Sequence, residues 1–108
     1  MADIEQYKED VAKYTSSVND AALETIAKSL ASVMGNRDAR NVSCSDEAEL
    51  ATVRKNFIEK KCGLDAKDPK AVAATAAVCE KMAEDRTKNR VTYYYLVAQE
   101  LGCLGKFG

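Results

Sequence analysis

The sequence predicts an all-α, single-domain bundle of about five helices over residues 1–108. Three observations indicate this class. One proline and five glycines leave few helix breakers, apolar residues recur at intervals of three and four, and the run within Arg90–Leu101 is apolar almost all round. A helix without a polar face must be enclosed, so we expect this one at the centre of the bundle. A buried strand is the alternative, but no other run resembles a partner strand.

The five expected helices cover residues 3–15, 20–34, 46–62, 69–84 and 89–102. Asp3, with Gln6 three residues later, matches a capping box at the start of the first helix. Asn19 or Asp20 caps the second helix, whose apolar stripe is the cleanest in the chain, and Gly35 ends it. Local signals therefore bound the first two helices.

The same kinds of signal bound the other three helices. Asp46 with Glu49 predicts a second capping box, and Gly63 ends the third helix. Asp68, which precedes the single proline, is typical of an N-cap followed by the first helical residue. Asn89 can cap the central fifth helix.

The four cysteines are Cys44, Cys62, Cys79 and Cys103, which lie 17 to 24 residues apart and form no Cys-x-x-Cys pair. Because histidine is absent, a zinc site would need all four thiolates from separate helices. A disulfide framework is uncommon in a cytosolic chain with its own core. We therefore expect four reduced cysteines that bind no metal, and we expect Cys62 and Cys79, on apolar helix faces, to pack as small apolar side chains.

Location and activity are predicted mainly from missing signals. The N-terminal residues lack a secretory pattern, and no apolar run approaches a membrane span, so we expect a cytoplasmic protein without membrane association. Neither a Gly-x-Ser-x-Gly elbow nor a Gly-rich phosphate loop is present, and histidine is absent. We therefore expect no enzyme activity, no catalytic residue and no cofactor.

Charge is divided unevenly along the chain. Residues 1–53 hold ten acidic and five basic residues, whereas residues 54–108 hold seven acidic and eleven basic ones. This asymmetry indicates either a surface for nucleic acid or another polyanion, or internal pairing of basic helices with acidic ones. The candidate basic patch consists of Arg54, Lys55, Lys60, Lys61, Arg86, Lys88 and Arg90.

Arg54 and Lys61 are seven residues apart and project from one side of the expected third helix, beside its apolar positions. A charge placed there must reach water or meet a counter-charge. Glu100 interrupts the apolar fifth helix, so it either faces solvent or has a partner such as Arg54, Lys61 or a tyrosine hydroxyl. We expect Arg54 to pair with a carboxylate of the domain, with Glu100 as the first candidate for an internal ion pair. The alternative is that Arg54, Lys61 and Arg90 converge on a pocket for a small anion or a partner's carboxylate.

Three stretches together resemble a known family. Residues 7–14 (YKEDVAKY), 54–64 (RKNFIEKKCGL) and 90–98 (RVTYYYLVA) are similar to small bacterial proteins labelled domain of unknown function 2853. The resemblance implies a compact helical domain in a bacterial cytoplasm and carries no activity, cofactor or catalytic residue. We therefore expect a non-enzymatic protein-interaction module, self-association included. Binding of nucleic acid or a small anion through the basic patch is the alternative.

Overall fold

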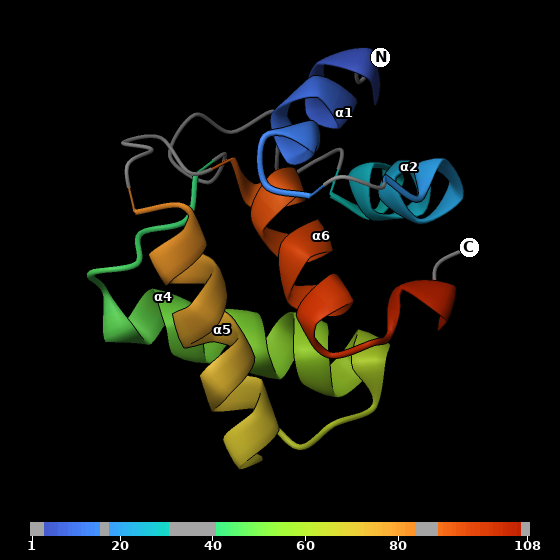
Figure 1. Ribbon diagram of the computed structural model, residues 1–108. Coiled ribbons are helices and arrows are strands. Elements are labelled where there is room, and N and C mark those ends of the chain that lie inside the picture. The colour runs from blue at the N-terminus through green and yellow to red at the C-terminus, as the bar shows by residue number, and fades with distance from the viewer. Residues whose placement is uncertain (1–3, 16–17, 31–40, 84–88, 107–108) are drawn as a thin grey trace.

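The computed structural model describes residues 4–15, 18–30, 41–83 and 89–106. Its helices are α1 (Ile4–Ala12), α2 (Asp20–Ser29), α4 (Glu47–Val53), the π-helix η2 (Arg54–Cys62), α5 (Pro69–Lys81), α6 (Arg90–Glu100) and the short 3-10 helix η3 (Leu104–Lys106). The described residues form no strand, only one isolated bridge between Asn41 and Asn89. The predicted all-α class is confirmed (Figure 1).

Helix α6 lies at the centre of the bundle, as the apolar run predicts. It packs against α1, α2, α5, η2 and η3, which surround it in Figure 1. All nine residues from Arg90 to Ala98 are buried. Because consecutive residues of an α-helix point about 100° apart, nine buried residues in succession mean that every side of the helix is covered.

The polar groups of α6 tie it to its neighbours. Thr92 donates its hydroxyl to the Asp10 carboxylate on α1 at 2.6 Å. The hydroxyl of Tyr95 accepts the backbone N–H of Asn19 at 2.7 Å, just before α2. The hydroxyl of Tyr93 donates to a backbone carbonyl of α5 at 3.1 Å. A buried polar group without a partner is costly, so these bonds allow a polar-containing helix to occupy the core.

The predicted helix starts are confirmed where the structure describes them. The N-cap side chains that accept a backbone N–H are those of Asn19, Asp46, Asp68 and Asn89. Gly63 ends η2 in the left-handed region at φ 77°, and the N–H of Leu64 then folds back to the carbonyl of Ile58 at 3.4 Å. The expected capping box at Asp3 and the stop at Gly35 lie outside the described residues.

The predicted third helix is not one α-helix, because its second half is the π-helix η2. Val53, Phe57, Ile58 and Cys62 are all buried. With about 100° between residues, an α-helix would place Val53 and Cys62 on opposite sides. The i→i+5 bonds of a π-helix give roughly 4.4 residues per turn, or about 82° per residue, which gathers all four within an arc of about 80°. The π-helix therefore places apolar side chains that an α-helix would separate together on one buried side.

The prediction of four reduced cysteines is wrong. Disulfides join Cys44 to Cys79 and Cys62 to Cys103, with Cα atoms 5.8 and 5.7 Å apart. The first ties the segment before α4 to α5, and the second ties the end of η2 to the chain after α6. Sequence separations of 35 and 41 residues concealed this proximity, which only the packing of the helices creates. In the chain-entropy model, loops of this length stabilise the fold by about 4 kcal/mol each.

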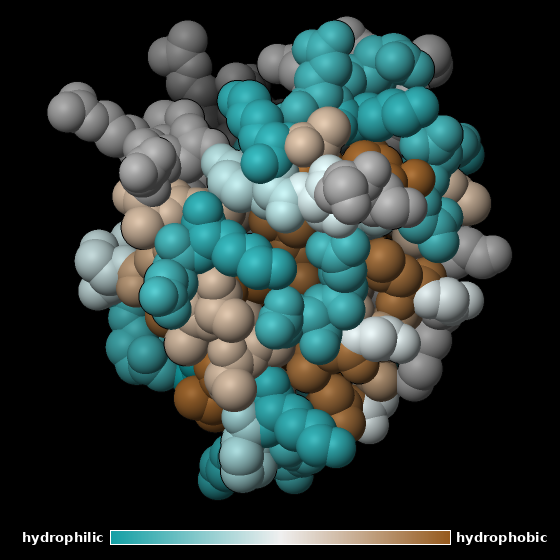
Figure 2. Space-filling view, in the orientation of Figure 1, coloured by the Kyte–Doolittle hydropathy of each residue, from teal (hydrophilic) through white to brown (hydrophobic). Residues whose placement is uncertain are grey.

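The face shown in Figure 2 carries both polar and apolar side chains. Figure 2 shows polar side chains spread over the face seen in Figure 1, with apolar atoms visible between them. Val72, at 45% exposure, is the one large apolar side chain that is exposed among the described residues. None of the described helices combines the length and apolarity needed to cross a bilayer.

Candidate functional site

A pocket of about 340 Å³ lies where the end of α2, the helix η2 and the start of α6 meet. Its lining residues are Ser29, Leu30, Thr52, Asn56, Phe57, Lys61, Arg90 and Tyr94. We call it the Lys61 pocket. Two of the three residues that were expected to converge, Lys61 and Arg90, line it, whereas Arg54 is absent from the lining.

The π-helix explains why Arg54 and Lys61 separate. Seven residues at about 100° each come within about 20° of two full turns, so an α-helix would place both side chains on one side. At about 82° per residue, the same seven steps leave the two side chains roughly 150° apart. Lys61 therefore lies on the side of η2 that faces the pocket, and Arg54 lies on the side that faces α5.

The predicted ion pair between Arg54 and Glu100 is wrong. The Arg54 guanidinium pairs with Glu47, and its Nη1 donates to the hydroxyl of Thr75 at 3.4 Å. The carboxylate of Glu100 pairs instead with Lys81 of α5 at 3.4 Å. Glu100 follows the buried part of α6 and is exposed, so it has no need of a buried partner. Arg54 does pair within the domain, but with an acid of the preceding helix.

Arg90 is a buried cation that helps to shape the pocket. Its side chain is 9% exposed and pairs with Glu49, while Nη1 donates to the hydroxyl of Tyr94 at 3.0 Å. The guanidinium carbon also lies 5.6 Å from the centre of the Tyr94 ring. Burial by itself lowers the pKa of Arg90, but the hydrogen bonds with Glu49 and Tyr94 and their charges raise it above its ordinary value. The guanidinium therefore stays charged.

Glu49 is the site residue that sequence reasoning misassigned. The capping-box pattern gave it a local role, yet its carboxylate reaches across to α6. A usable signal was present, because Glu49 precedes the core residue Val53 by four positions, and such residues share one face of an α-helix. An acid on a core-facing stripe predicts a distant basic partner.

The apolar part of the pocket is a stacked pair of rings. Phe57 of η2 and Tyr94 of α6 have ring centres 4.4 Å apart and planes tilted by 38°. Lys61 is exposed beside them, and no carboxylate of the described residues lies within ion-pair distance of it. The same holds for Lys55 and Lys60 on the same helix. Two further members of the predicted basic patch, at positions 86 and 88, lie outside the described residues.

Comparison with protein families identifies the family of this chain. The family model described as "Protein of unknown function (DUF2853)" matches residues 6–104. The chain belongs to the DUF2853 family. A search of the curated proteins finds no match. The DUF2853 match spans the described residues that line the Lys61 pocket and both disulfides.

The chemistry of the Lys61 pocket in this DUF2853 protein suits binding. The described lining offers hydroxyl and amide groups, two cationic side chains and an aromatic surface. Within the described part of the chain, no three Cys, Asp or Glu residues are placed to hold a metal ion. A lysine beside an aromatic wall attracts an anionic group that is attached to an apolar one.

Proposed function

We propose that this DUF2853 protein is a non-enzymatic interaction module that binds an acidic segment of a partner protein in the Lys61 pocket. The observation that carries the proposal is the position of Lys61, an exposed cation beside the stacked rings of Phe57 and Tyr94. A partner carboxylate would pair with the ammonium group of Lys61. An apolar or aromatic side chain next to that acid would pack against the rings.

The charges around the pocket support an acidic partner. Arg90 is neutralised by Glu49, so it holds the Tyr94 ring in place and adds little net charge. Lys55, Lys60 and Lys61 give η2 a positive surface that faces solvent. Such a surface raises the rate at which an acidic partner associates, and raised salt weakens the effect.

A small anion or a nucleic acid is the second candidate ligand, and the three exposed lysines of η2 are the observation that favours it. The apolar wall favours a protein segment, because an inorganic anion makes no use of Leu30 or Phe57. The two classes differ in salt dependence. Binding of a nucleic acid weakens steeply with salt as counterions are released, whereas contacts with the aromatic wall persist.

Binding of short peptides tests the proposal. A displayed peptide library should yield sequences with Asp or Glu next to an aromatic residue. Lys61→Glu should weaken their binding at least about tenfold, or about 1.4 kcal/mol. Lys67→Glu is the matched control, because Lys67 is an exposed lysine outside the pocket lining. Inorganic phosphate and single-stranded DNA serve as competing probes. Selection of peptides without acids, or equal loss in both variants, would contradict the proposal.

We also propose a second copy of the chain as one partner that can supply the acidic segment.

We propose the bacterial cytoplasm as the compartment in which the protein acts. Two disulfides are uncommon in that compartment, where small thiols keep most cysteines reduced. Alkylation of the native bacterium before lysis, followed by mass spectrometry, reports the state of each cysteine pair in the cell. Both pairs fully oxidised in growing cells would argue for an oxidising compartment.

A further inference from the structure

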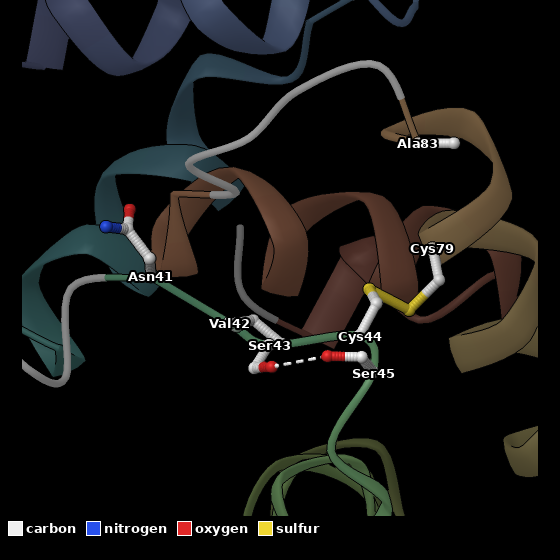
Figure 3. A pocket seen from close by; sticks show the side chains of 7 residues that line it. All are labelled: Asn41, Val42, Ser43, Cys44, Ser45, Cys79 and Ala83. Atoms are coloured by element: carbon white, nitrogen blue, oxygen red, sulfur yellow. Dashed lines mark hydrogen bonds between the residues drawn. A yellow bond between two sulfur atoms is a disulfide. The ribbon is translucent and has the colours of Figure 1, made fainter.

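The two disulfides have different surroundings. Cys62 and Cys103 are 4% and 6% exposed, so their bond lies in the core. Cys44 and Cys79 are half-buried and line an open pocket of about 510 Å³. The other described residues of its lining are Asn41, Val42, Ser43, Ser45 and Ala83. Figure 3 shows the bond between Cys44 and Cys79 joining the segment before α4 to α5. A reagent in solution therefore has access to one disulfide and is kept from the other.

A buried phenol lies on one side of the accessible bond. The hydroxyl oxygen of Tyr93 is 3.3 Å from Sγ of Cys79 and 3.1 Å from the backbone carbonyl of Thr75. A disulfide sulfur carries no proton, so Sγ can only accept in this contact. The phenol donates its single proton to the Thr75 carbonyl while the disulfide is intact, and it can turn that proton to Sγ once Cys79 becomes a thiolate. Burial raises the pKa of Tyr93, which keeps this hydroxyl protonated and able to donate.

We propose that Cys44–Cys79 is a site of thiol–disulfide exchange, at which a low-molecular-weight thiol attacks Cys44 and Cys79 leaves. The attacking thiolate forms a new S–S bond to Sγ of Cys44 as the Cys44–Cys79 bond breaks. The electron pair of the broken bond leaves on Sγ of Cys79 as a thiolate. The hydroxyl of Tyr93 stabilises this thiolate, which then takes a proton from solvent. A second thiol molecule attacking the mixed disulfide completes the reduction and releases the oxidised small molecule.

The direction of attack follows from the leaving group. Exchange is faster when the departing sulfur carries its negative charge more easily. The Tyr93 hydroxyl contacts Cys79, so departure from Cys79 is favoured over departure from Cys44. The adduct then forms on Cys44, in the non-helical segment before α4 that lines the pocket.

The pocket suits a small peptide-like thiol. Its volume of about 510 Å³ falls within the range of small-molecule sites. The described lining residues carry no charge, and Asn41, Ser43 and Ser45 supply exposed amide and hydroxyl groups. The hydroxyl oxygens of Ser43 and Ser45 lie 3.2 Å apart, near the Cys44–Cys79 disulfide (Figure 3). These groups can exchange their mutual hydrogen bond for bonds to the amides of a bound thiol.

Opening this disulfide leaves other contacts that hold the segment. Val42 is 4% exposed and belongs to the hydrophobic core. Asn41 is bridged to Asn89 at the start of α6. Helix α4 follows directly and is tied to α6 by the pair of Glu49 with Arg90. The fold therefore persists when Cys44 carries an adduct, and thiolation is a surface modification of the folded protein.

Reaction of the oxidised full-length protein with reduced glutathione tests the proposal. Samples are quenched with N-ethylmaleimide and mapped by peptide mass spectrometry, and circular dichroism follows the fold. We expect glutathione on Cys44, maleimide on Cys79, an intact bond between Cys62 and Cys103, and an unchanged helical spectrum. Reduction of the buried bond first, an adduct on Cys79 as the first product, or loss of helix with the first bond would each overturn the proposal.

The role of Tyr93 is tested by a matched pair of variants. Tyr93→Phe removes the hydroxyl beside Cys79 and should slow the first exchange step about tenfold, since hydrogen bonds to charged groups are the strong ones. Tyr95→Phe removes an equally buried hydroxyl of the same helix that bonds Asn19 instead, and it should leave the rate unchanged. Equal rates in Tyr93→Phe and the wild type, with both variants folded, would refute the assigned leaving group.

Discussion

Replacing Arg90 with methionine should cost far more stability than replacing any exposed basic residue. The substitution keeps an apolar stem of similar length but removes the guanidinium. Glu49 then loses its partner at 26% side-chain exposure, and the hydroxyl of Tyr94 loses the donor that lies 3.0 Å away. Helix α6 would also lose its ion pair with α4.

The magnitude follows from burial. Removing one partner of a buried pair costs roughly 3 to 5 kcal/mol, because the other charge is left without compensation. Water reaches part of Glu49, so we expect the lower end, about 3 kcal/mol. For a domain of this size, that corresponds to a fall in Tm of roughly 12 °C. Adding Glu49→Gln removes the stranded charge, so the double variant should recover part of the loss.

Urea unfolding of the two single variants and the double variant measures these terms. Lys28→Met is the control, because Lys28 pairs with Glu24 on an exposed face and should change Tm by less than about 2 °C. A cost of less than about 1 kcal/mol for Arg90→Met would refute the reasoning. A double variant whose loss of stability equals the sum of the two single losses would also refute it, because additive losses mean that Arg90 and Glu49 are not coupled.

Three further predictions concern Arg54, Tyr93 and Leu96. Arg54→Met should cost only about 1 kcal/mol in urea unfolding, because its partner Glu47 is 76% exposed and stays solvated; a cost above about 3 kcal/mol would contradict this. Burial raises the pKa of Tyr93 above 10.0, so the unfolded chain releases this proton first and stability falls as pH rises past 10.0, by up to about 1.4 kcal/mol per pH unit. The Tyr93→Phe variant should lack this pH-dependent loss of stability. Parallel curves of stability against pH for the wild type and the variant would contradict the prediction. Leu96→Ala, at a fully buried position of α6, should cost about 2 to 5 kcal/mol, and a loss below about 1 kcal/mol would show that α6 is not central.

Features set by neighbouring residues were predictable from the sequence. The apolar run of α6 required burial on every side, and the structure buries Arg90 to Ala98 without a break. The caps at Asp46, Asp68 and Asn89 act on the first turn of their own helices, so sequence position alone identifies them. Gly63 likewise ends η2 because its left-handed φ of 77° suits glycine.

Features set by helix packing were not predictable in the same way. The disulfide partners depend on how α5 meets the segment before α4, which no spacing in the sequence reveals. The partner of Arg54 depended on the type of helix, because a π-helix turns Arg54 away from Lys61. Val53 and Cys62, placed on opposite sides by an α-helical wheel, were the available sign that this segment is wound differently.

The most direct test of the account is a titration of the ¹⁵N-labelled protein with a short acidic peptide that carries an aromatic residue beside its acid. If the Lys61 pocket binds such segments, the amide signals that shift should belong to residues around it, among them Leu30, Asn56, Lys61 and Tyr94. Lys61→Glu should abolish those shifts and leave the rest of the spectrum in place. Shifts confined to another face of the molecule, or the same shifts in the Lys61→Glu variant, would contradict the proposed role of the pocket.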